Sequence, residues 1–372
     1  MESTARRTGT LMLHLLGRCN LKCHHCYMDG APSRQEQLPL ENVIATIQEC
    51  EKLGIGTLYL TGGEPVLYRG LPEVLRAAAR VPELEVTLCT NATLIDDKRI
   101  ALFQEGNVRL NVSVDGDETF HDYFRDLRGA FRAAESGVGA AVKAGLNVTI
   151  ITTISQSNRH LLPQVAQWSA NMGAAKLLVQ PLLNLGRGRQ IADQRLTSTQ
   201  LNELILQLSD LANKHRHAGL DCALVGKSRR FLLTHPCGAY VCNGVGCHRS
   251  VEKEIKKVVI REDGTVLPEV TNLSHEFALG NITDGPLSEL VENYFETGYD
   301  KFDRLCRSLY AEVLPTWQDA FVPWDQIVAE RSYNWRADVE SDTQHLKCGI
   351  CSSERPLVGA ATRHHGKEAV CT

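Results

Sequence analysis

The chain has 372 residues, of which 43% are hydrophobic and 23% are charged, and its formal net charge is −4. This length allows one large domain and a smaller one, and the weak negative charge gives no reason to expect a nucleic acid or an anionic membrane as a partner. The amino-terminal apolar run is too short to cross a membrane and is followed by no small-residue cleavage site. We therefore expect a cytoplasmic protein.

Short apolar segments alternate with helical patterns over the first 217 residues. The segments predicted to form strands are Leu11–Leu16, Thr57–Thr61, Val86–Asn91, Arg109–Asp115, Val148–Ile154 and Lys176–Leu182. They alternate only weakly between apolar and polar residues, as strands buried on both faces do. Six β/α repeats are too few to close an eight-stranded barrel. We predict an α/β fold with a partial (β/α)6 barrel over residues 1–217, with ligands at the carboxyl ends of the strands.

The chain contains 13 cysteines, most of which fall into three groups, at 19–26, 237–247 and 348–371. Disulfides are rare in a reducing cytosol, so clustered cysteines favour metal binding. Cys50, Cys89, Cys222 and Cys306 are scattered, and we expect them to be small hydrophobic residues of the core.

The first group places Cys19, Cys23 and Cys26 at the spacing C-x3-C-x2-C, directly after the first predicted strand. Three thiolates on one loop can bind three irons of a [4Fe–4S] cube and leave the fourth iron without a protein ligand. The alternative is a zinc site completed by His24 or His25.

This motif, at the end of the first strand of a β/α repeat, resembles the signature of the radical S-adenosylmethionine (SAM) superfamily, and the resemblance covers roughly residues 10–215. It implies that SAM chelates the open iron and that an electron from the cluster breaks a carbon–sulfur bond. The residue before the third cysteine is usually aromatic in that family. Here it is His25, whose flat ring the resemblance places beside the adenine.

After the second predicted strand comes the sequence Thr61-Gly62-Gly63-Glu64-Pro65. Two glycines let a backbone approach a ligand closely, and a carboxylate suits a ligand that carries an ammonium group. The family resemblance assigns Gly62, Gly63 and Glu64 to the amino group of SAM. An ordinary glycine turn is the alternative.

Polar residues also end the third and fourth predicted strands, where site residues are expected. Asn91 ends the third strand, and the stretch from Ser113 to Arg125 resembles the SAM-binding segment of the peptide-modifying branch of the family. That resemblance implies that Ser113 and Arg125 contact SAM, Arg125 by pairing with the SAM carboxylate. We expect Asp115 and the pair His121-Asp122 to be local capping and turn residues.

The sixth predicted strand continues into a segment with Gly186, Arg187, Gly188 and Arg189. This segment either borders the adenine or the substrate, or is a solvated loop, and the sequence favours neither. By similarity to the family, the backbone of Leu183 touches the adenine.

Residues 218–372 form a second predicted domain, rich in cysteine, which resembles the SPASM domain of peptide-modifying radical SAM enzymes. Its candidate ligands are Cys237, Cys242, Cys247, Cys348, Cys351 and Cys371. Glu269 stands where the resembled domain has a cysteine, so it is either an oxygen ligand or the mark of a lost site. We expect at least one auxiliary [4Fe–4S] cluster; the alternative is a degenerate domain with a zinc knuckle or no metal.

These resemblances imply a radical SAM enzyme that generates a 5′-deoxyadenosyl radical and modifies a ribosomally made precursor peptide by backbone excision (splicease type), epimerisation or crosslinking. They imply an electron donor such as flavodoxin or ferredoxin. The incomplete SPASM pattern and the short segment before Leu11 fit enzymes that borrow leader recognition from a separate small protein. Two alternatives remain: a radical SAM enzyme that acts on a small molecule or a tetrapyrrole, and a non-catalytic iron–sulfur protein.

Overall fold

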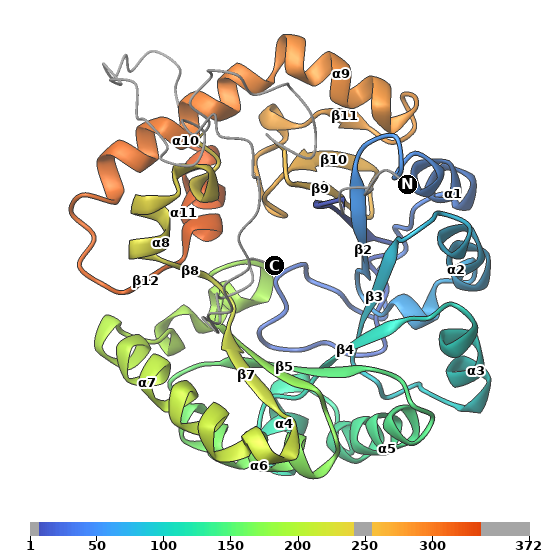
Figure 1. The fold of residues 1–372 in the computed structure, drawn as a ribbon, viewed down its shortest axis with the longest axis vertical. Helices are drawn as coiled ribbons and strands as arrows, with labels where there is room; N and C mark the ends of the chain where they lie inside the picture. The colour runs from blue at the N-terminus through green and yellow to red at the C-terminus, as the bar shows by residue number, and fades with distance from the viewer. Residues whose placement is uncertain (1–6, 242–254, 336–372) are drawn as a thin grey trace, which may run out of the picture.

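A computed structural model of the chain describes residues 7–241 and 255–335. Within these residues, ten strands form one sheet in the order β11-β10-β9-β1-β2-β3-β4-β5-β6-β7. Figure 1 shows that the sheet curves around the interior of the molecule and that helices surround it on the outside. This arrangement is the predicted partial barrel, and it includes more strands than the six expected.

Seven strands run parallel to one another from β1 to β7, and each pairs with the next one along the chain. They are β1 (Gly9–His14), β2 (Ile55–Thr61), β3 (Glu85–Thr90), β4 (Arg109–Ser113), β5 (Val148–Ile154), β6 (Lys176–Pro181) and β7 (Asp221–Leu224). The short β7 was not predicted from the sequence, and it lies beyond residue 217.

On the other side of β1 the sheet continues with β9 (Lys257–Ile260), β10 (Thr265–Pro268) and β11 (Gly280–Asn281). β9 pairs with β1 in parallel, whereas β9, β10 and β11 pair with one another in antiparallel fashion. The sheet therefore runs through the predicted boundary at residue 217, and the division into two domains there stays a prediction.

Helices connect the parallel strands and cover the outer face of the sheet (Figure 1). They are α1 (Leu40–Gln48), α2 (Leu71–Ala79), α3 (Asp97–Glu105), α4 (Glu118–Arg125), α5 (Ala130–Lys143), α6 (Leu162–Asn171) and α7 (Ser198–His215). Later in the chain come α8 (Arg229–Thr234), α9 (Leu287–Thr297), α10 (Tyr299–Val313) and α11 (Trp324–Ser332), together with a small sheet of β8 (Lys227–Ser228) and β12 (Phe321–Val322).

The strand β5 buries one face completely and the other only in part. In β5, the buried residues Val148, Ile150, Thr152 and Ile154 alternate with the half-buried residues Thr149, Ile151 and Thr153. Successive side chains of a strand point to opposite faces of the sheet. The buried face contributes Val148, Ile150 and Ile154 to the hydrophobic core, while the other face stays partly accessible.

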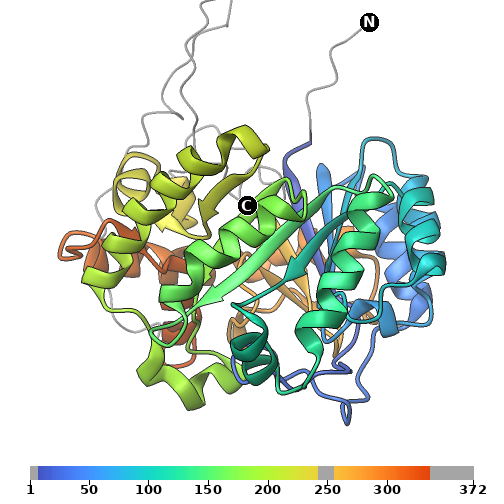
Figure 2. The same cartoon turned by 90° about the horizontal axis from the view of Figure 1, so that it is seen from below.

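The loop between β1 and α1, residues 15–39, lies at the carboxyl ends of the parallel strands (Figure 2). Isolated bridges join Leu16 to Gln37 and Arg18 to Ala31, which fold this loop back on itself. We call residues 15–39 the cysteine loop, because Cys19, Cys23 and Cys26 lie on it.

No helix in the described ranges is long and apolar enough to span a membrane. None of the described cysteines takes part in a disulfide.

Candidate functional site

The three sulfur atoms of the cysteine loop each lie near an N–H donor. The backbone N–H of Leu21 donates to Cys19 Sγ at 3.4 Å, and that of Gly30 donates to Cys26 Sγ at 3.3 Å. The guanidinium Nη1 of Arg125 reaches Cys23 Sγ at 3.8 Å. Donors of this kind stabilise thiolates. The three cysteines therefore have surroundings that suit metal-bound sulfur.

Burial disfavours the ionised form of the thiols in this loop unless a nearby cation stabilises it. Cys19 and Cys23 are buried, and Cys26 is half-buried. Burial raises the pKa of the Cys19 thiol to about 12 and also raises the pKa of Cys23, although Arg125 acts in the opposite direction there. A metal deprotonates coordinating thiols. The donor set therefore fits an iron–sulfur cluster.

The single-ion zinc alternative finds no support in the geometry. The ring of His25 stacks on Phe124 with centroids 4.0 Å apart, and the ring of His24 lies against Tyr123 at 5.1 Å. Across the described part of the chain, no three His, Cys, Asp or Glu side chains gather closely enough to hold one metal ion. In a [4Fe–4S] cluster each thiolate binds a different iron, so the three sulfur atoms do not have to meet at one metal ion.

The glycine motif after β2 packs against the backbone of the cysteine loop. Gly62 has a φ of +131°, and a Cβ on Gly63 would lie 2.1 Å from the carbonyl oxygen of Arg18. The N–H of Gly63 donates to Leu16 O at 2.7 Å, and that of Glu64 donates to Arg18 O at 2.9 Å. The two glycines thus hold the loop against the carboxyl end of β2, a closeness that a side chain would prevent.

The carboxylate of Glu64 is buried at the ends of β2 and β3. It accepts hydrogen bonds from Thr90 Oγ1 at 2.7 Å, from the backbone N–H of Asn91 at 2.9 Å and from that of Val66 at 3.3 Å. Its burial raises the pKa of this carboxyl group, which the three hydrogen bonds oppose. Glu64 therefore ties two strand ends together, and its role towards the SAM amino group stays a prediction.

Asn91 connects the end of β3 to the cysteine loop. Its Nδ2 donates to Asn20 Oδ1 at 2.9 Å and lies 3.9 Å from Cys19 Sγ. Ser113 ends β4 on the half-buried face, and Leu183 follows β6 and is also half-buried. All three stand at carboxyl ends of the strands, as expected, and their contacts with SAM stay predictions.

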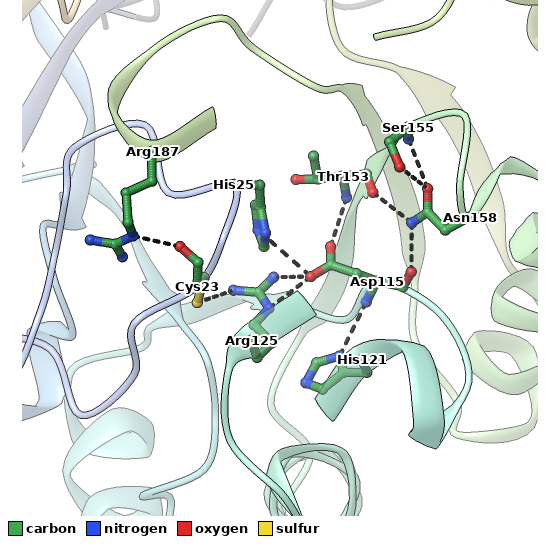
Figure 3. A network of polar contacts seen from close by, with 9 residues as sticks. All are labelled: Cys23, His25, Asp115, His121, Arg125, Thr153, Ser155, Asn158 and Arg187. Carbon is green, nitrogen blue, oxygen red and sulfur yellow. Dashed lines mark hydrogen bonds and ion pairs between the residues drawn. The ribbon is translucent and has the colours of Figure 1, made fainter. Parts of the chain in front are cut away.

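Arg125 lies in the middle of a buried polar network (Figure 3). Its Nε and Nη2 both reach Asp115 Oδ2, at 2.7 and 2.6 Å, while Nη1 faces Cys23. Asp115 is 1% exposed and Arg125 is 8% exposed. α4 carries Arg125 at its last residue, and the side chain of Asp117 caps the start of that helix by accepting the N–H of Phe120 at 2.8 Å.

The prediction that Asp115 is a local turn residue is wrong. Its Oδ1 accepts the N–H of Thr153 at 2.8 Å, its Oδ2 binds Arg125, and the Nε2 of His25 lies 3.7 Å from the same oxygen. Asp115 therefore links β4, β5, α4 and the cysteine loop. The sequence does contain a signal for the ion pair, because an arginine follows Asp115 ten residues later. The contact of Asp115 with β5 depends on how the strands pair in the sheet, which the sequence does not show.

The residues His121 and Asp122 have the local roles that were predicted for them. Asp122 accepts the backbone N–H groups of Gly129 and Phe131, at 2.5 and 2.8 Å, and so orders the start of α5. The Nδ1 of His121 accepts the N–H of Asp115 at 3.2 Å. Burial lowers the pKa of His121 to about 3, which keeps that ring nitrogen available as an acceptor.

Arg187 clamps the cysteine loop from the 3-10 segment η3 (Gly186–Gln194). Its Nε donates to Cys23 O at 2.7 Å, its Nη2 donates to Gly30 O at 2.8 Å, and its backbone N–H donates to Cys26 O at 2.9 Å. A Cβ on Gly186 would lie 2.4 Å from Cys26 O. The sequence left this segment open between site and solvated loop; the structure packs it directly on the cysteine loop, whereas Arg189 is exposed.

The tail candidates are only partly described. Cys237 lies half-buried in the 3-10 segment η5 (Pro236–Ala239), while Cys242, Cys247, Cys348, Cys351 and Cys371 lie outside the described residues. Glu269 is 2% exposed and accepts a hydrogen bond from the backbone N–H of Lys256.

Two of the four scattered cysteines are core residues as predicted, since Cys50 and Cys306 are fully buried. Cys222 is half-buried and packs against this core, whereas Cys89 is half-buried outside it. The amide Nδ2 of Asn111 lies 4.0 Å from Cys89 Sγ, so this cysteine stands in polar surroundings.

Comparison with protein families gives a match to the amino-terminal part of the chain. The model of the radical SAM superfamily matches residues 13–168, which include the cysteine loop, the glycine motif and the Asp115–Arg125 pair. Residues 13–168 therefore form a radical SAM domain.

The chain is 32% identical over 212 residues to Fe-coproporphyrin III synthase of Methanosarcina barkeri, an alignment that covers 56% of this chain and 53% of that protein. It is 29% identical over 179 residues to the sporulation killing factor maturation protein SkfB of Bacillus subtilis, with coverage of 48% and 43%. The chain thus spans about half the length of the curated relatives it matches.

The crystal structure of Streptococcus suis SuiB bound to its precursor peptide SuiA resembles the present fold with a TM-score of 0.64. The sequence identity is 15%, and the match covers 80% of this chain and 67% of SuiB. This similarity confirms the radical SAM fold beyond the end of the family match.

Proposed function

We propose that the chain is a radical SAM enzyme that modifies a ribosomally made precursor peptide. The observation that carries this proposal is the assembly of three donor-stabilised cysteine sulfurs, the glycine motif and a buried arginine at the carboxyl ends of β1 to β4. A [4Fe–4S] cluster on Cys19, Cys23 and Cys26 with SAM at the open iron would supply the reductive cleavage that yields a 5′-deoxyadenosyl radical.

The residues of this chain hold the site in place. Gly62 and Gly63 let the cysteine loop pack closely against the end of β2. Arg187 donates hydrogen bonds to carbonyl oxygens of the loop, and Arg125 places a positive charge beside Cys23. The SAM contacts proposed for Glu64, Asn91, Ser113, Arg125, His25 and Leu183 all lie around this loop or at neighbouring strand ends. One face of the His25 ring packs on Phe124, so its other face is the one left for an adenine.

Two relatives support a peptide substrate. SkfB is described as a maturation protein, and SuiB, which shares the fold, binds its precursor peptide. We further propose a cytoplasmic location, a flavodoxin or ferredoxin as electron donor, and a separate small protein that recognises the leader of the precursor. The reaction is a peptide backbone excision, epimerisation or crosslink.

A second candidate is a radical SAM enzyme that acts on a tetrapyrrole. The similarity to Fe-coproporphyrin III synthase favours it, because that relative is the more similar of the two in sequence. Incubation with a panel of iron tetrapyrroles and with the peptides encoded beside the gene, followed by mass spectrometry of both, separates the two candidates.

The test of the proposal begins with anaerobically reconstituted protein, SAM and dithionite. We expect release of 5′-deoxyadenosine and, with the correct precursor, a mass change in the peptide. A Cys19→Ala/Cys23→Ala/Cys26→Ala variant should lose about four irons and all 5′-deoxyadenosine. Absence of 5′-deoxyadenosine from wild-type protein would instead identify a non-catalytic iron–sulfur protein.

We also propose at least one auxiliary [4Fe–4S] cluster bound by the tail cysteines. Cys348→Ala/Cys351→Ala should keep the first cluster and release some 5′-deoxyadenosine, yet give no modified peptide. Full iron content together with full peptide modification in this variant would show that these two cysteines hold no cluster that the reaction needs.

A further inference from the structure

A polar cavity of about 170 Å³ lies between the cysteine loop and the hairpin of β9 and β10. Its lining includes His14 at the end of β1, Tyr27 and Arg34 from the cysteine loop, Glu262 from the hairpin turn, and Thr271 and Asn272 beyond β10. Arg189 and Tyr333 also line it and are exposed, so they mark its open side. Because Tyr27 directly follows Cys26, the cavity borders the cluster site.

Two buried nitrogen atoms in this lining have no hydrogen-bond partner within residues 7–241 and 255–335. They are Nε2 of His14, a residue that is 1% exposed, and Nδ2 of Asn272. Buried polar groups are nearly always paired in folded proteins, and an unpaired one is costly. An amide Nδ2 can only donate, so at least one of these atoms is suited to an acceptor oxygen from a ligand.

The charges around the cavity favour a negative ligand. Three arginines line it, Arg34, Arg189 and Arg261, against two carboxylates, Asp29 and Glu262. Arg34 Nη2 binds Glu262 Oε1 at 2.9 Å, and His14 Nδ1 lies 3.8 Å from Glu262 Oε2. Burial raises the pKa of Glu262, but the hydrogen bond and charge of His14 and the charge of Arg261 outweigh it and lower this pKa to about 2. Glu262 is therefore ionised and already paired, and so is Arg34, whose Nε also binds Glu36 Oε2 at 2.7 Å. Arg189 and Arg261, against Asp29, are the lining charges that remain for an incoming group.

The geometry points to this cavity as the binding site for one carboxylate side chain, aspartate or glutamate, of the substrate peptide. The inference rests on the peptide substrate proposed above and identifies the type of side chain that the enzyme recognises in it. The volume of about 170 Å³ suits a single side chain, because sites for complete small ligands usually measure about 300–1,000 Å³. A side chain anchored there fixes the neighbouring peptide residues beside the cysteine loop.

The test uses reconstituted full-length protein with SAM and no reductant, and two probes: N-acetyl-glutamate amide and N-acetyl-glutamine amide. Dissociation constants come from ligand-observed NMR. We expect wild-type protein to bind the glutamate probe about ten-fold more tightly than the glutamine probe. Asn272→Leu should remove most of that preference, whereas Asn293→Leu, at an exposed position of α9, should preserve it.

Arg261→Gln is the second variant, because it removes one cavity charge at a partly exposed turn position even if Asn272→Leu does not fold. It should reduce the preference for the glutamate probe several-fold. Equal affinity of the wild type for both probes would overturn the inference. So would binding of coproporphyrin III that Asn272→Leu weakens, if the glutamate probe does not bind.

Release of 5′-deoxyadenosine with dithionite is measured in the same preparations. Its absence in wild type would defeat the proposed radical chemistry while leaving the probe measurements intact. A lost probe preference with normal 5′-deoxyadenosine release would defeat the cavity assignment alone.

Discussion

Arg125 holds Asp115 with two of its nitrogen atoms and faces Cys23 with the third, so one guanidinium joins the strand ends to the cysteine loop. Neither partner of the ion pair is more than 8% exposed. Removing one member of a buried pair leaves an uncompensated charge, which typically destabilises a protein by about 3–5 kcal/mol. The pair is thus structural in addition to any contact that Arg125 makes with SAM.

We expect Asp115→Asn to lower the free energy of unfolding by about 3 kcal/mol, because Arg125 keeps its charge and loses its carboxylate. Chemical denaturation of the reconstituted protein measures this. The control is Glu73→Gln, which removes an exposed i,i+3 ion pair with Arg76 and should change stability by less than about 1 kcal/mol. Similar losses in both variants would contradict the structural role of the pair.

Arg125→Ala should weaken SAM binding roughly ten- to a hundred-fold, as the loss of one charge-assisted hydrogen bond does. Isothermal titration with SAM checks the affinity. Since the same change breaks the buried pair with Asp115, circular dichroism must show that the variant is folded. Unchanged affinity in a folded variant would assign Arg125 to the support of the loop alone.

Gly63→Ala should disrupt the contact between the glycine motif and the cysteine loop. The new Cβ would lie 2.1 Å from Arg18 O, a backbone atom that can move only with the loop. We expect the iron bound after reconstitution to fall by about half or more. Gly139→Ala is the control: it lies within α5, its Cβ would lie 3.4 Å from Met172 Cε, and it should keep full iron while stabilising the helix by about 0.5–1 kcal/mol.

Arg187→Ala should make the first cluster easier to remove. The variant loses the guanidinium bonds to Cys23 O and Gly30 O but keeps the backbone bond to Cys26 O, so the loop loosens without detaching. We expect iron loss to a chelator about ten-fold faster than in wild type. Arg189→Ala removes an exposed arginine of the same segment, and equal rates of iron loss in the two variants would contradict the clamp.

Glu269→Gln should change how stability depends on pH. Burial raises the pKa of Glu269 from 4.5 to about 7, although Lys257 and Lys227 act against the shift. The folded protein holds the proton of the Glu269 carboxyl group more tightly than the unfolded chain does. The stability that this proton contributes is therefore complete below pH 4.5 and is lost as the pH rises through about 7. Between pH 5 and pH 7.5, unfolding free energies should fall more steeply in wild type than in Glu269→Gln, by about 3 kcal/mol in total. Parallel curves would show that the carboxyl is not protonated in the folded state.

The first six parallel strands could be predicted from the sequence. Their segments are apolar enough to be buried and too short to be helices. β7 was missed because it has four residues and begins with an exposed aspartate. The hairpin of β9 and β10 turns at Gly264, where φ is +86°. The pairing of β9 with β1 could not be predicted, because nothing in either strand specifies so distant a partner.

The candidate site was predictable where its chemistry is local and not where it depends on the sheet. The spacing of Cys19, Cys23 and Cys26 lies within one loop, so the sequence displays it directly. Asp115 was misread because its bond to Thr153 follows from the pairing of β4 with β5. The Arg187 clamp and the cavity at His14 join segments more than 150 residues apart and can be seen only in the fold.

The place of β1 between β2 and β9 has a consequence for how the chain folds. During synthesis, β1 can pair with β2 once residue 61 has emerged, but its other edge stays open until residues 257–260 follow. An open strand edge is a site for wrong pairing, and late contacts between distant residues slow folding. The first strand, which leads into the cysteine loop, therefore gains its final neighbour only after all seven parallel strands have been made.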